Sequence, residues 1–303
     1  MIDELRRRLQ GRVERDLPLA PLTTYGIGGP ADIALFPASR RDLERAIGLL
    51  HERGLPWVVL GGGSNVLVSD RGVRGAVLLT TGLARIEVRG GAVVAEAGAQ
   101  SHAVAVAAQR AGLTGAEFLA WLPGTVGGAC LMNARAYGGE VSQILRRARV
   151  VTPAGDAEEL TLEPGQFAYK RSPLAGRGLV IAEVTLELAP GDPAAIQAAM
   201  DGIEVRRRAN HEMDHPSCGC VFKNDYSIGI SSGQVVDRCG LKGYAVGAAR
   251  VSPHHANFVI NTGGASAVDV RRVIEHVRAE VERQTGHRLE LEVQLLGEWD
   301  EAD

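Results

Sequence analysis

Cysteine and histidine side chains are concentrated in one short stretch of the chain. His211, His215, Cys218 and Cys220 lie within ten residues, and Cys239 follows. Thiols and imidazoles can hold zinc or move protons near neutral pH. However, Cys218 and Cys220 are separated by one residue, where zinc motifs favour two, and a fourth ligand is ambiguous. A zinc site is therefore a minor hypothesis, and we predict no metal site.

Glycines gather in three segments between apolar runs. One is Gly61-Gly62-Gly63-Ser64-Asn65, and the others are residues 122–129 and 24–31. Glycine lets backbone N–H groups converge on an anion and lets a flat ligand approach closely. The first segment matches neither the dinucleotide pattern G-x-G-x-x-G nor the P-loop ending Gly-Lys-Ser/Thr. We expect the three segments together to bind a phosphorylated ligand, since turns alone do not explain them.

Helices and strands are expected to alternate around these segments. Ser39 is a suitable N-cap for a helix that Gly54 ends, and Leu43, Ile47 and Leu50 form its apolar stripe. Further elements of this half are strands at 57–60, 66–68 and 179–188, hairpins at 86–97 and 149–160, and a helix at 101–111. This mixture predicts an α+β fold.

The second part of the chain begins with a helix that Asp192-Pro193 opens and that runs to about Arg208. Beyond it we expect a strand at 256–261, a helix from Ser266 to Gly286, and a final alternating strand at 289–295. The stripe of the long helix is Val270, Val273, Ile274, Val277 and Val281. We therefore expect domains at 1–190, with subdomains of about 1–80 and 81–190, and at 191–303.

The composition excludes several classes of protein. The chain has 303 residues, 33 basic and 36 acidic side chains and a net charge of −3, which does not suggest nucleic-acid binding. It has no apolar run of transmembrane length and no apolar N-terminal core for a signal peptide, so we expect a cytoplasmic protein without membrane insertion. Four cysteines are too few for a disulfide scaffold at this length.

The motifs, in their order and spacing, resemble the shorter subtype of the UDP-N-acetylenolpyruvoylglucosamine reductase family. Besides the glycine segments, the matching motifs are at 132–138, 167–172, 216–224, 233–237, 241–243, 255–261 and 289–293. The resemblance covers roughly Pro21 to Trp299. It implies a two-part FAD-binding domain of the vanillyl-alcohol-oxidase type, followed by a smaller α/β substrate-binding domain.

The resemblance also implies the reaction of an FAD-dependent oxidoreductase. NADPH reduces FAD, and UDP-N-acetylglucosamine enolpyruvate then receives a hydride at its methylene carbon and a proton at the neighbouring carbon. The product is UDP-N-acetylmuramate, a peptidoglycan precursor. The implied FAD contacts are Tyr25, Gly28, Gly61, Gly62, Gly63, Ser64, Asn65, Gly124, Thr125, Gly127, Gly128, Ala134, Arg135 and Ile181. The implied UDP-sugar contacts are Lys223, Asn224, Lys242 and His255.

The catalytic positions depart from the family pattern in two of three places. Cys220 stands where the family has a serine proton donor, and a thiol with an ordinary pKa of about 8.5 can serve there. Lys170 stands at the arginine position, with Arg171 beside it. On an extended segment these two side chains point to opposite sides, and register favours Lys170. Glu292 matches the family's glutamate, although Glu290 looks equivalent without the resemblance.

Several alternatives remain open. Arg135 replaces a usual glycine, so its side chain must point away from FAD or contact the FAD phosphates. The same fold could serve an FAD-dependent oxidase, although no haem motif or evident covalent-flavin histidine supports this and His102 leaves it open. A non-catalytic zinc- or ligand-binding relative is a further alternative. Oligomeric state, protein partners, and NADPH over NADH are not fixed by the sequence.

Overall fold

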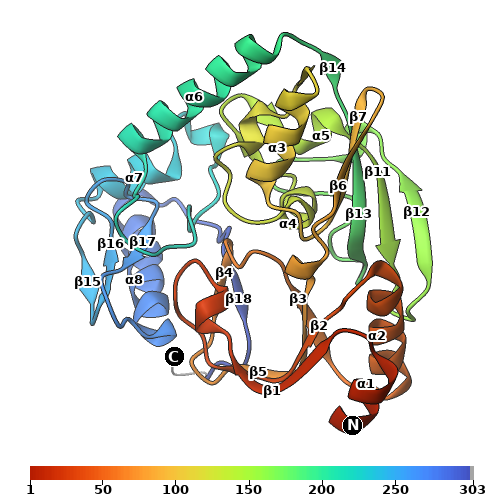
Figure 1. Cartoon of the computed structure of the whole chain (residues 1–303). Helices are drawn as coiled ribbons and strands as arrows, with labels where there is room; N and C mark the ends of the chain where they lie inside the picture. The colour runs from red at the N-terminus through yellow and green to blue at the C-terminus, as the bar shows by residue number, and fades with distance from the viewer. Residues whose placement is uncertain (301–303) are drawn as a thin grey trace. The chain divides into compact units, whose positions relative to one another are not determined.

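The chain forms two compact units, each assembled from separate stretches of sequence (Figure 1). This computed structural model describes residues 1–300, and within it unit 1 contains residues 1–15, 33–62 and 75–207. Unit 2 contains residues 16–32, 63–74 and the chain from Arg208 onward. These units differ from a continuous division at residue 190, because two N-terminal segments cluster with the C-terminal third. The functional limits 1–190 and 191–303 stay a prediction.

The first sheet has the strand order β1-β2-β5-β3, and β3 and β5 run parallel. Its strands are β1 (Arg12–Pro18), β2 (Pro30–Phe36), β3 (Trp57–Leu60) and β5 (Val73–Leu79). Helix α2 (Arg40–Glu52) follows β2, and Ser39 caps it by accepting a hydrogen bond from the backbone N–H of Asp42. Its predicted stripe is buried in one core cluster with Leu5 of α1 (Ile2–Arg8).

The second sheet of unit 1 is antiparallel, in the order β12-β11-β13-β7-β6. Its strands are β6 (Ile86–Arg89), β7 (Ala92–Glu96), β11 (Leu145–Val151), β12 (Ala157–Thr161) and β13 (Val180–Glu187). Both predicted hairpins and the predicted strand are confirmed. Helices α3 (Ser101–Arg110), α4 (Val126–Leu131) and α5 (Val141–Ile144) share the core of this sheet and lie together on one of its sides (Figure 1).

Short elements complete unit 1 and lead out of it. The short strands are β8 (Leu113–Thr114), β9 (Arg135–Ala136), β10 (Gly139–Glu140) and β14 (Ala189–Pro190). Helix α6 (Pro193–Asn210) begins at the predicted proline and contributes Ile196 and Met200 to the core of unit 1. No helix within residues 1–300 is long and apolar enough to cross a membrane.

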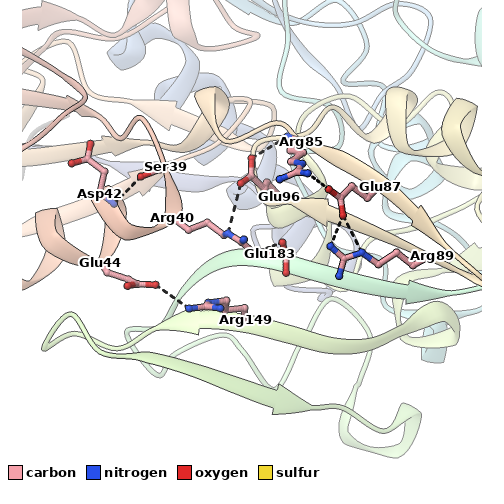
Figure 2. A network of polar contacts seen from close by, with 10 residues as sticks. All are labelled: Ser39, Arg40, Asp42, Glu44, Arg85, Glu87, Arg89, Glu96, Arg149 and Glu183. Carbon is pink, nitrogen blue, oxygen red and sulfur yellow. Dashed lines mark hydrogen bonds and ion pairs between the residues drawn. The ribbon is translucent and has the colours of Figure 1, made fainter.

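An ion-pair network joins α2 to the second sheet (Figure 2). Glu96 of β7 and Glu183 of β13 face each other across the sheet, and Arg40 pairs with both carboxylates. Like charges that face each other destabilise a sheet, so Arg40 offsets this repulsion. Arg149 of β11 pairs with Glu44 of α2 at 3.4 Å. These pairs tie the residues of the two expected subdomains together within unit 1.

Unit 2 is built on a long helix, α8 (Ala267–Thr285), which packs against a three-stranded antiparallel sheet. That sheet contains β15 (Ala245–Val246), β16 (Ala249–Val251) and β17 (Val259–Asn261), and α7 (Ser232–Arg238) lies in the same core. Ser266 is the N-cap of α8, and Gly286 ends this helix as predicted, with φ of 73°. The five apolar residues of the predicted stripe are fully buried.

Two predicted strands of unit 2 were wrong in length. β17 begins at Val259 and not at residue 256, because Ala256 and Asn257 form a turn. The strand expected at 289–295 is reduced to β18 (Gln294–Leu296), which runs parallel to β4 (Val66–Val68). The apolar and polar residues alternate at 289–293, but this segment is irregular, and Leu291 forms only an isolated bridge with Phe222.

Candidate active site

Two of the glycine segments pack directly against each other in unit 1. Gly61 and Gly62 follow β3 and lie on Gly124 and Thr125, which precede α4. A Cβ at Gly62 would lie 2.6 Å from the Cα of Gly124, and one at Gly61 would lie 2.6 Å from Oγ1 of Thr125. Close-packed interiors leave no room for such contacts. Backbone packing alone therefore requires glycine at position 62, whereas a Cβ at Gly61 would collide with the side chain of Thr125.

The start of α4 contains one glycine that packing does not require. Gly127 is buried, and a Cβ there would lie 2.7 Å from the Cβ of Ala97. Gly128 is exposed, and a Cβ there would meet only Oγ1 of Thr125, at 3.6 Å. An exposed glycine inside a helix is unfavourable unless something else needs the space. Gly128 therefore leaves open space at the protein surface, and its contact with FAD stays a prediction.

The glycine segments of unit 2 are joined by hydrogen bonds. The backbone N–H of Thr24 donates to the carbonyl of Gly63 at 3.0 Å, and φ of 61° at Gly63 favours glycine. A Cβ at Gly28 would lie 3.0 Å from the Cβ of Val68. Ser64 is half-buried in the bend that follows Gly63. These predicted FAD residues therefore lie near one another in unit 2.

Tyr25 and Asn65, predicted to contact FAD, lie close to other residues of unit 2. The Tyr25 ring is fully buried in the core of unit 2, and its hydroxyl faces the thiol of Cys218. The Asn65 amide donates a hydrogen bond of 3.0 Å to the carbonyl of Glu292. A flavin contact by Tyr25 would have to come from its backbone, whereas its side chain supports the segment that carries Cys218 and Cys220.

The segment after Cys220 is held on both sides. On one side, the backbone N–H of Val221 donates to the carbonyl of Asn257, and the Asn257 amide exchanges two hydrogen bonds with the backbone of Phe222, at 2.9 and 2.8 Å. On the other side, the N–H of Glu292 donates to the carbonyl of Val221 at 2.8 Å. Cys220 and Glu292 are thereby brought to adjacent segments of unit 2.

Burial distinguishes Cys218 from Cys220, and it also distinguishes Glu290 from Glu292. Burial raises the pKa of the Cys218 thiol to about 12, with smaller contributions from the nearby charges of Cys220 and Glu292. Cys220 is half-buried and Cys218 is fully buried. Glu292 is half-buried, whereas Glu290 is exposed and pairs with Lys223. Glu292 is thus the more suitable carboxylate for a site beside Cys220.

Three of the predicted UDP-sugar residues lie near α7, with Asn224 at its start, Lys242 beyond its end and His255 in the turn before β17. The side-chain oxygen of Asn224 accepts a hydrogen bond of 2.9 Å from the N–H of Ser232, and Lys242 pairs with Asp237 at 2.9 Å. Burial lowers the pKa of His255, and the charge of Lys242 lowers it further. His255 and Lys242 are therefore close enough for their charges to interact.

Lys170 and Arg171 lie on a tight turn in unit 1, so the extended conformation expected for them was wrong. Ala168 and Arg171 pair across the turn, and Lys170 has φ of 55°. The fully buried Asn133 fixes this turn by donating a hydrogen bond of 2.9 Å to the carbonyl of Ala168. Lys170 is half-buried, with Nζ 5.9 Å from the ring centroid of Tyr169, and Arg171 is exposed.

The remaining predicted cofactor residues of unit 1 differ in exposure. Arg135 in β9 is exposed, and its strand pairs with β10 at Glu140. Ala134 and Ile181 are buried in the core of the second sheet. Within residues 1–300, no group of three or more His, Cys, Asp or Glu side chains is arranged to hold a metal ion.

Sequence reasoning missed the residues that hold the site in place. Asn133 and Asn257 lie in the matching motifs but were given no role of their own, and Glu212 was not predicted to have one. All three are buried polar side chains, and each has a hydrogen-bond partner that lies 35 or 40 residues away in the sequence. A polar residue beside apolar neighbours gives no local signal of such distant partners.

Comparisons with known proteins agree with this architecture. Residues 31–161 match the FAD binding domain family, and residues 211–296 match the C-terminal domain of UDP-N-acetylenolpyruvoylglucosamine reductase. The reductase of Halalkalibacterium halodurans is 40% identical over 98% of this chain and 99% of its own, and reductase 2 of Symbiobacterium thermophilum is 44% identical over 95% and 93%.

A solved structure gives the same result. The crystal structure of the reductase from Thermus caldophilus superposes with a TM-score of 0.80 at 34% identity, covering 94% of this chain and 99% of that one. The expected α+β fold, with an FAD-binding domain followed by a second domain, is confirmed. The chain therefore belongs to the UDP-N-acetylenolpyruvoylglucosamine reductase family of FAD-dependent oxidoreductases.

Proposed function

We propose that the protein reduces UDP-N-acetylglucosamine enolpyruvate to UDP-N-acetylmuramate, with NADPH as the reductant, as a step of peptidoglycan precursor synthesis. Membership of the reductase family supports the reaction. The observation that carries the assignment of residues is the pair of hydrogen-bonded segments that bring Cys220 and Glu292 together. The cytoplasmic location stays a prediction.

The residues proposed to contact FAD belong to the glycine segments of unit 1 and of unit 2. In unit 1 we propose the backbone of Gly61, Gly62, Gly124, Thr125, Gly127 and Gly128, together with Ala134, Arg135 and Ile181. In unit 2 we propose Gly28, Gly63, Ser64, Asn65 and the backbone of Tyr25. The bound flavin supplies the means of transferring a hydride from NADPH to the substrate.

Cys220 is the proposed proton donor. Hydride addition at the enolpyruvyl methylene places negative charge on the neighbouring carbon and its carboxylate, and that carbon must take a proton. The Cys220 thiol gives up its S–H proton to this carbon, and a new C–H bond forms. The hydrogen bonds between Asn257 and the backbone of Val221 and Phe222, called here the Asn257 clamp, limit the movement of the thiol during this step. Glu292 would orient or polarise the reacting group beside it.

A cation is needed for the charge that develops on the carboxylate. We propose Lys170, because it is half-buried on a turn held by Asn133, whereas Arg171 is exposed. Lysine supplies a point charge without the planar fork of arginine. For the nucleotide sugar, we propose Lys223, Asn224, Lys242 and His255, since a diphosphate requires cations and hydrogen-bond donors.

The test uses the purified protein and its two half-reactions. Flavin absorbance near about 450 nm should be bleached by NADPH, and the enolpyruvyl nucleotide sugar should then restore it in the absence of oxygen. A colourless protein would contradict the flavin assignment. Reoxidation by oxygen alone, with an alcohol or sugar as the electron donor, would instead indicate an oxidase. Binding of the sugar without turnover would indicate a non-catalytic relative.

A further inference from the structure

A buried carboxylate lies behind the proposed substrate residues of unit 2. Glu212 is 6% exposed, although acidic side chains are rarely buried without partners. Its carboxylate accepts hydrogen bonds from Oγ of Ser252 at 2.6 Å, from Nδ1 of His215 at 3.2 Å and from the N–H of Asp214 at 3.2 Å. Burial alone would raise the pKa of Glu212, but these partners outweigh it and lower the pKa, so the carboxylate is charged at neutral pH.

Ser252 connects Glu212 to the turn that contains His254 and His255 by hydrogen bonds. A hydroxyl has one proton and two lone pairs. Because Ser252 donates its proton to Glu212, its lone pairs remain to accept the N–H groups of His254 at 3.1 Å and His255 at 3.2 Å. Ser252 is fully buried, so water cannot take over either role. The carboxylate therefore fixes the direction of the hydroxyl, and the hydroxyl fixes the backbone at His255.

The His255 ring has one protonation form that suits its surroundings. Its Nδ1 accepts a hydrogen bond of 3.2 Å from the N–H of Asn257, so the proton of the neutral ring is on Nε2. The ring packs 4.7 Å from the ring of Phe258 and 5.5 Å from that of His211. A Cβ at Gly233 would lie 3.3 Å from Cε1 of His255, so the ring also occupies the space that this glycine leaves.

We propose that Glu212 is a positioning residue that acts through Ser252 to hold His255 as an Nε2–H donor to an oxygen of the nucleotide sugar. The proposal rests on the proposed function in one respect, namely that His255 contacts the substrate. His255 would be a neutral hydrogen-bond donor, and its partner would be an acceptor oxygen of the nucleotide sugar. Lys242, whose charge interacts with His255, would supply the cation at the same place. Glu212 itself touches neither substrate nor cofactor.

The test compares Ser252→Ala, Glu212→Gln and His255→Gln with the control Asp214→Asn. Asp214 is exposed and contributes only its backbone N–H to Glu212, so the control removes one charge from the same loop without breaking the chain of hydrogen bonds. In Ser252→Ala and His255→Gln, KM for the nucleotide sugar should rise about tenfold, which is the effect of one lost hydrogen bond. Reduction of the flavin by NADPH should stay unchanged in Ser252→Ala, Glu212→Gln and Asp214→Asn.

A double-mutant cycle separates positioning from a general loss of structure. Combining Ser252→Ala with His255→Gln should raise KM no further than His255→Gln alone, because both act through one contact. Additive effects would overturn the proposal, and so would an unchanged KM in Ser252→Ala or His255→Gln.

A spectroscopic measurement keeps the proposal testable without turnover. The ¹⁵N shifts of His255 should show a proton on Nε2 in the natural protein and a mixture of both tautomers in Ser252→Ala and Glu212→Gln. The signal is assigned from its loss in His255→Gln. Unchanged shifts would overturn the proposal. Altered shifts in a protein that does not reduce the enolpyruvyl sugar would contradict the proposed function alone, since the positioning role would stand.

Discussion

The glycine segments of unit 1 and the Cys220 segment of unit 2 hold their backbones in opposite ways. In unit 1, Gly62 lies on Gly124 because neither has a side chain to separate them. In unit 2, the segment at Val221 and Phe222 is held by the side chain of Asn257, which reaches across from a distant turn. The first site is shaped by the absence of side chains, and the second by one buried amide.

This difference determines what a substitution does. At a packed glycine, any added atom collides with backbone, so the damage is steric and spreads to both loops. At a buried amide, removal of the side chain leaves polar backbone groups without partners, so the damage is a loss of hydrogen bonds. The predictions below test this contrast, beginning with the largest expected effect.

The two thiols around Gly219 should differ most strongly. Burial raises the pKa of Cys218 to about 12, so at pH 8 its thiolate is about a thousandfold rarer than that of a free thiol. Iodoacetamide should therefore modify Cys220 while Cys218 stays unmodified, as measured by peptide mass spectrometry. Burial also raises the pKa of Cys130 in unit 1 to about 12, which makes it the matched control. Rapid modification of Cys218 would show that the segment opens.

The same raised pKa values predict how stability depends on pH. Above about pH 8.5 the unfolded chain loses the protons of Cys130 and Cys218, whereas the folded chain keeps them up to about pH 12. Their contribution to stability is thus complete below about pH 8.5 and falls as the pH rises beyond it.

Removing the proposed proton donor tests the chemistry of unit 2. Cys220→Ala should slow reoxidation of the reduced flavin by the nucleotide sugar at least about a hundredfold, the usual effect of a lost general acid. Reduction by NADPH should be nearly unchanged, and stopped-flow absorbance separates the two steps. Cys220→Ser should stay active. Unchanged turnover in Cys220→Ala would remove this thiol from the mechanism.

Asn257→Ala should lower the free energy of unfolding by about 2–3 kcal/mol, because two buried hydrogen bonds to Phe222 are lost and their backbone partners stay buried. It should also slow proton donation, since Val221 and Phe222 connect directly to Cys220. Urea denaturation and the stopped-flow assay measure the two effects. Normal reoxidation in a destabilised Asn257→Ala would mean that the clamp matters for folding and not for catalysis.

A pair of glycine substitutions tests unit 1. Gly62→Ala should destabilise the FAD-free protein by about 2 kcal/mol, because its Cβ would collide with Gly124. Gly128→Ala should leave that stability unchanged or slightly raised, because its Cβ meets no close contact and alanine favours a helix. Only Gly128→Ala should weaken FAD binding without weakening the fold. Equal loss of stability in both variants would contradict the distinction between packing and ligand glycines.

The features predicted correctly from the sequence are those encoded by neighbouring residues. Ser39 caps its helix through the residue three positions later, and the stripes of α2 and α8 are periodic within one helix. The hairpins around Gly90-Gly91 and Pro153 likewise need only local turns. By contrast, β3 and β4 are neighbours in sequence but belong to different sheets, and β4 pairs with β18 more than 220 residues away. No local pattern contains that pairing.

The candidate site shows the same limit. The resemblance indicated Cys220 and Glu292, and the structure brings their segments together. The turn at Lys170 was missed because its conformation depends on Asn133, 35 residues before the carbonyl of Ala168 that it holds. The burial of the Tyr25 side chain was missed because it depends on the whole core of unit 2, which no local pattern shows.

The smallest expected effect concerns the ion pairs that join α2 to the second sheet. Arg40→Met keeps much of the apolar stem but leaves Glu96 and Glu183 facing each other, which should cost about 1 kcal/mol of stability at pH 7. The control Arg149→Met breaks only one partly exposed pair, with Glu44, and should cost less than about 0.5 kcal/mol. Because the penalty in Arg40→Met comes from repulsion between two charged carboxylates, it should shrink at high salt, which screens charges. Urea denaturation at low and at high sodium chloride concentration measures this change. A penalty that stayed constant with salt would mean that Arg40 acts through the packing of its stem and not through charge.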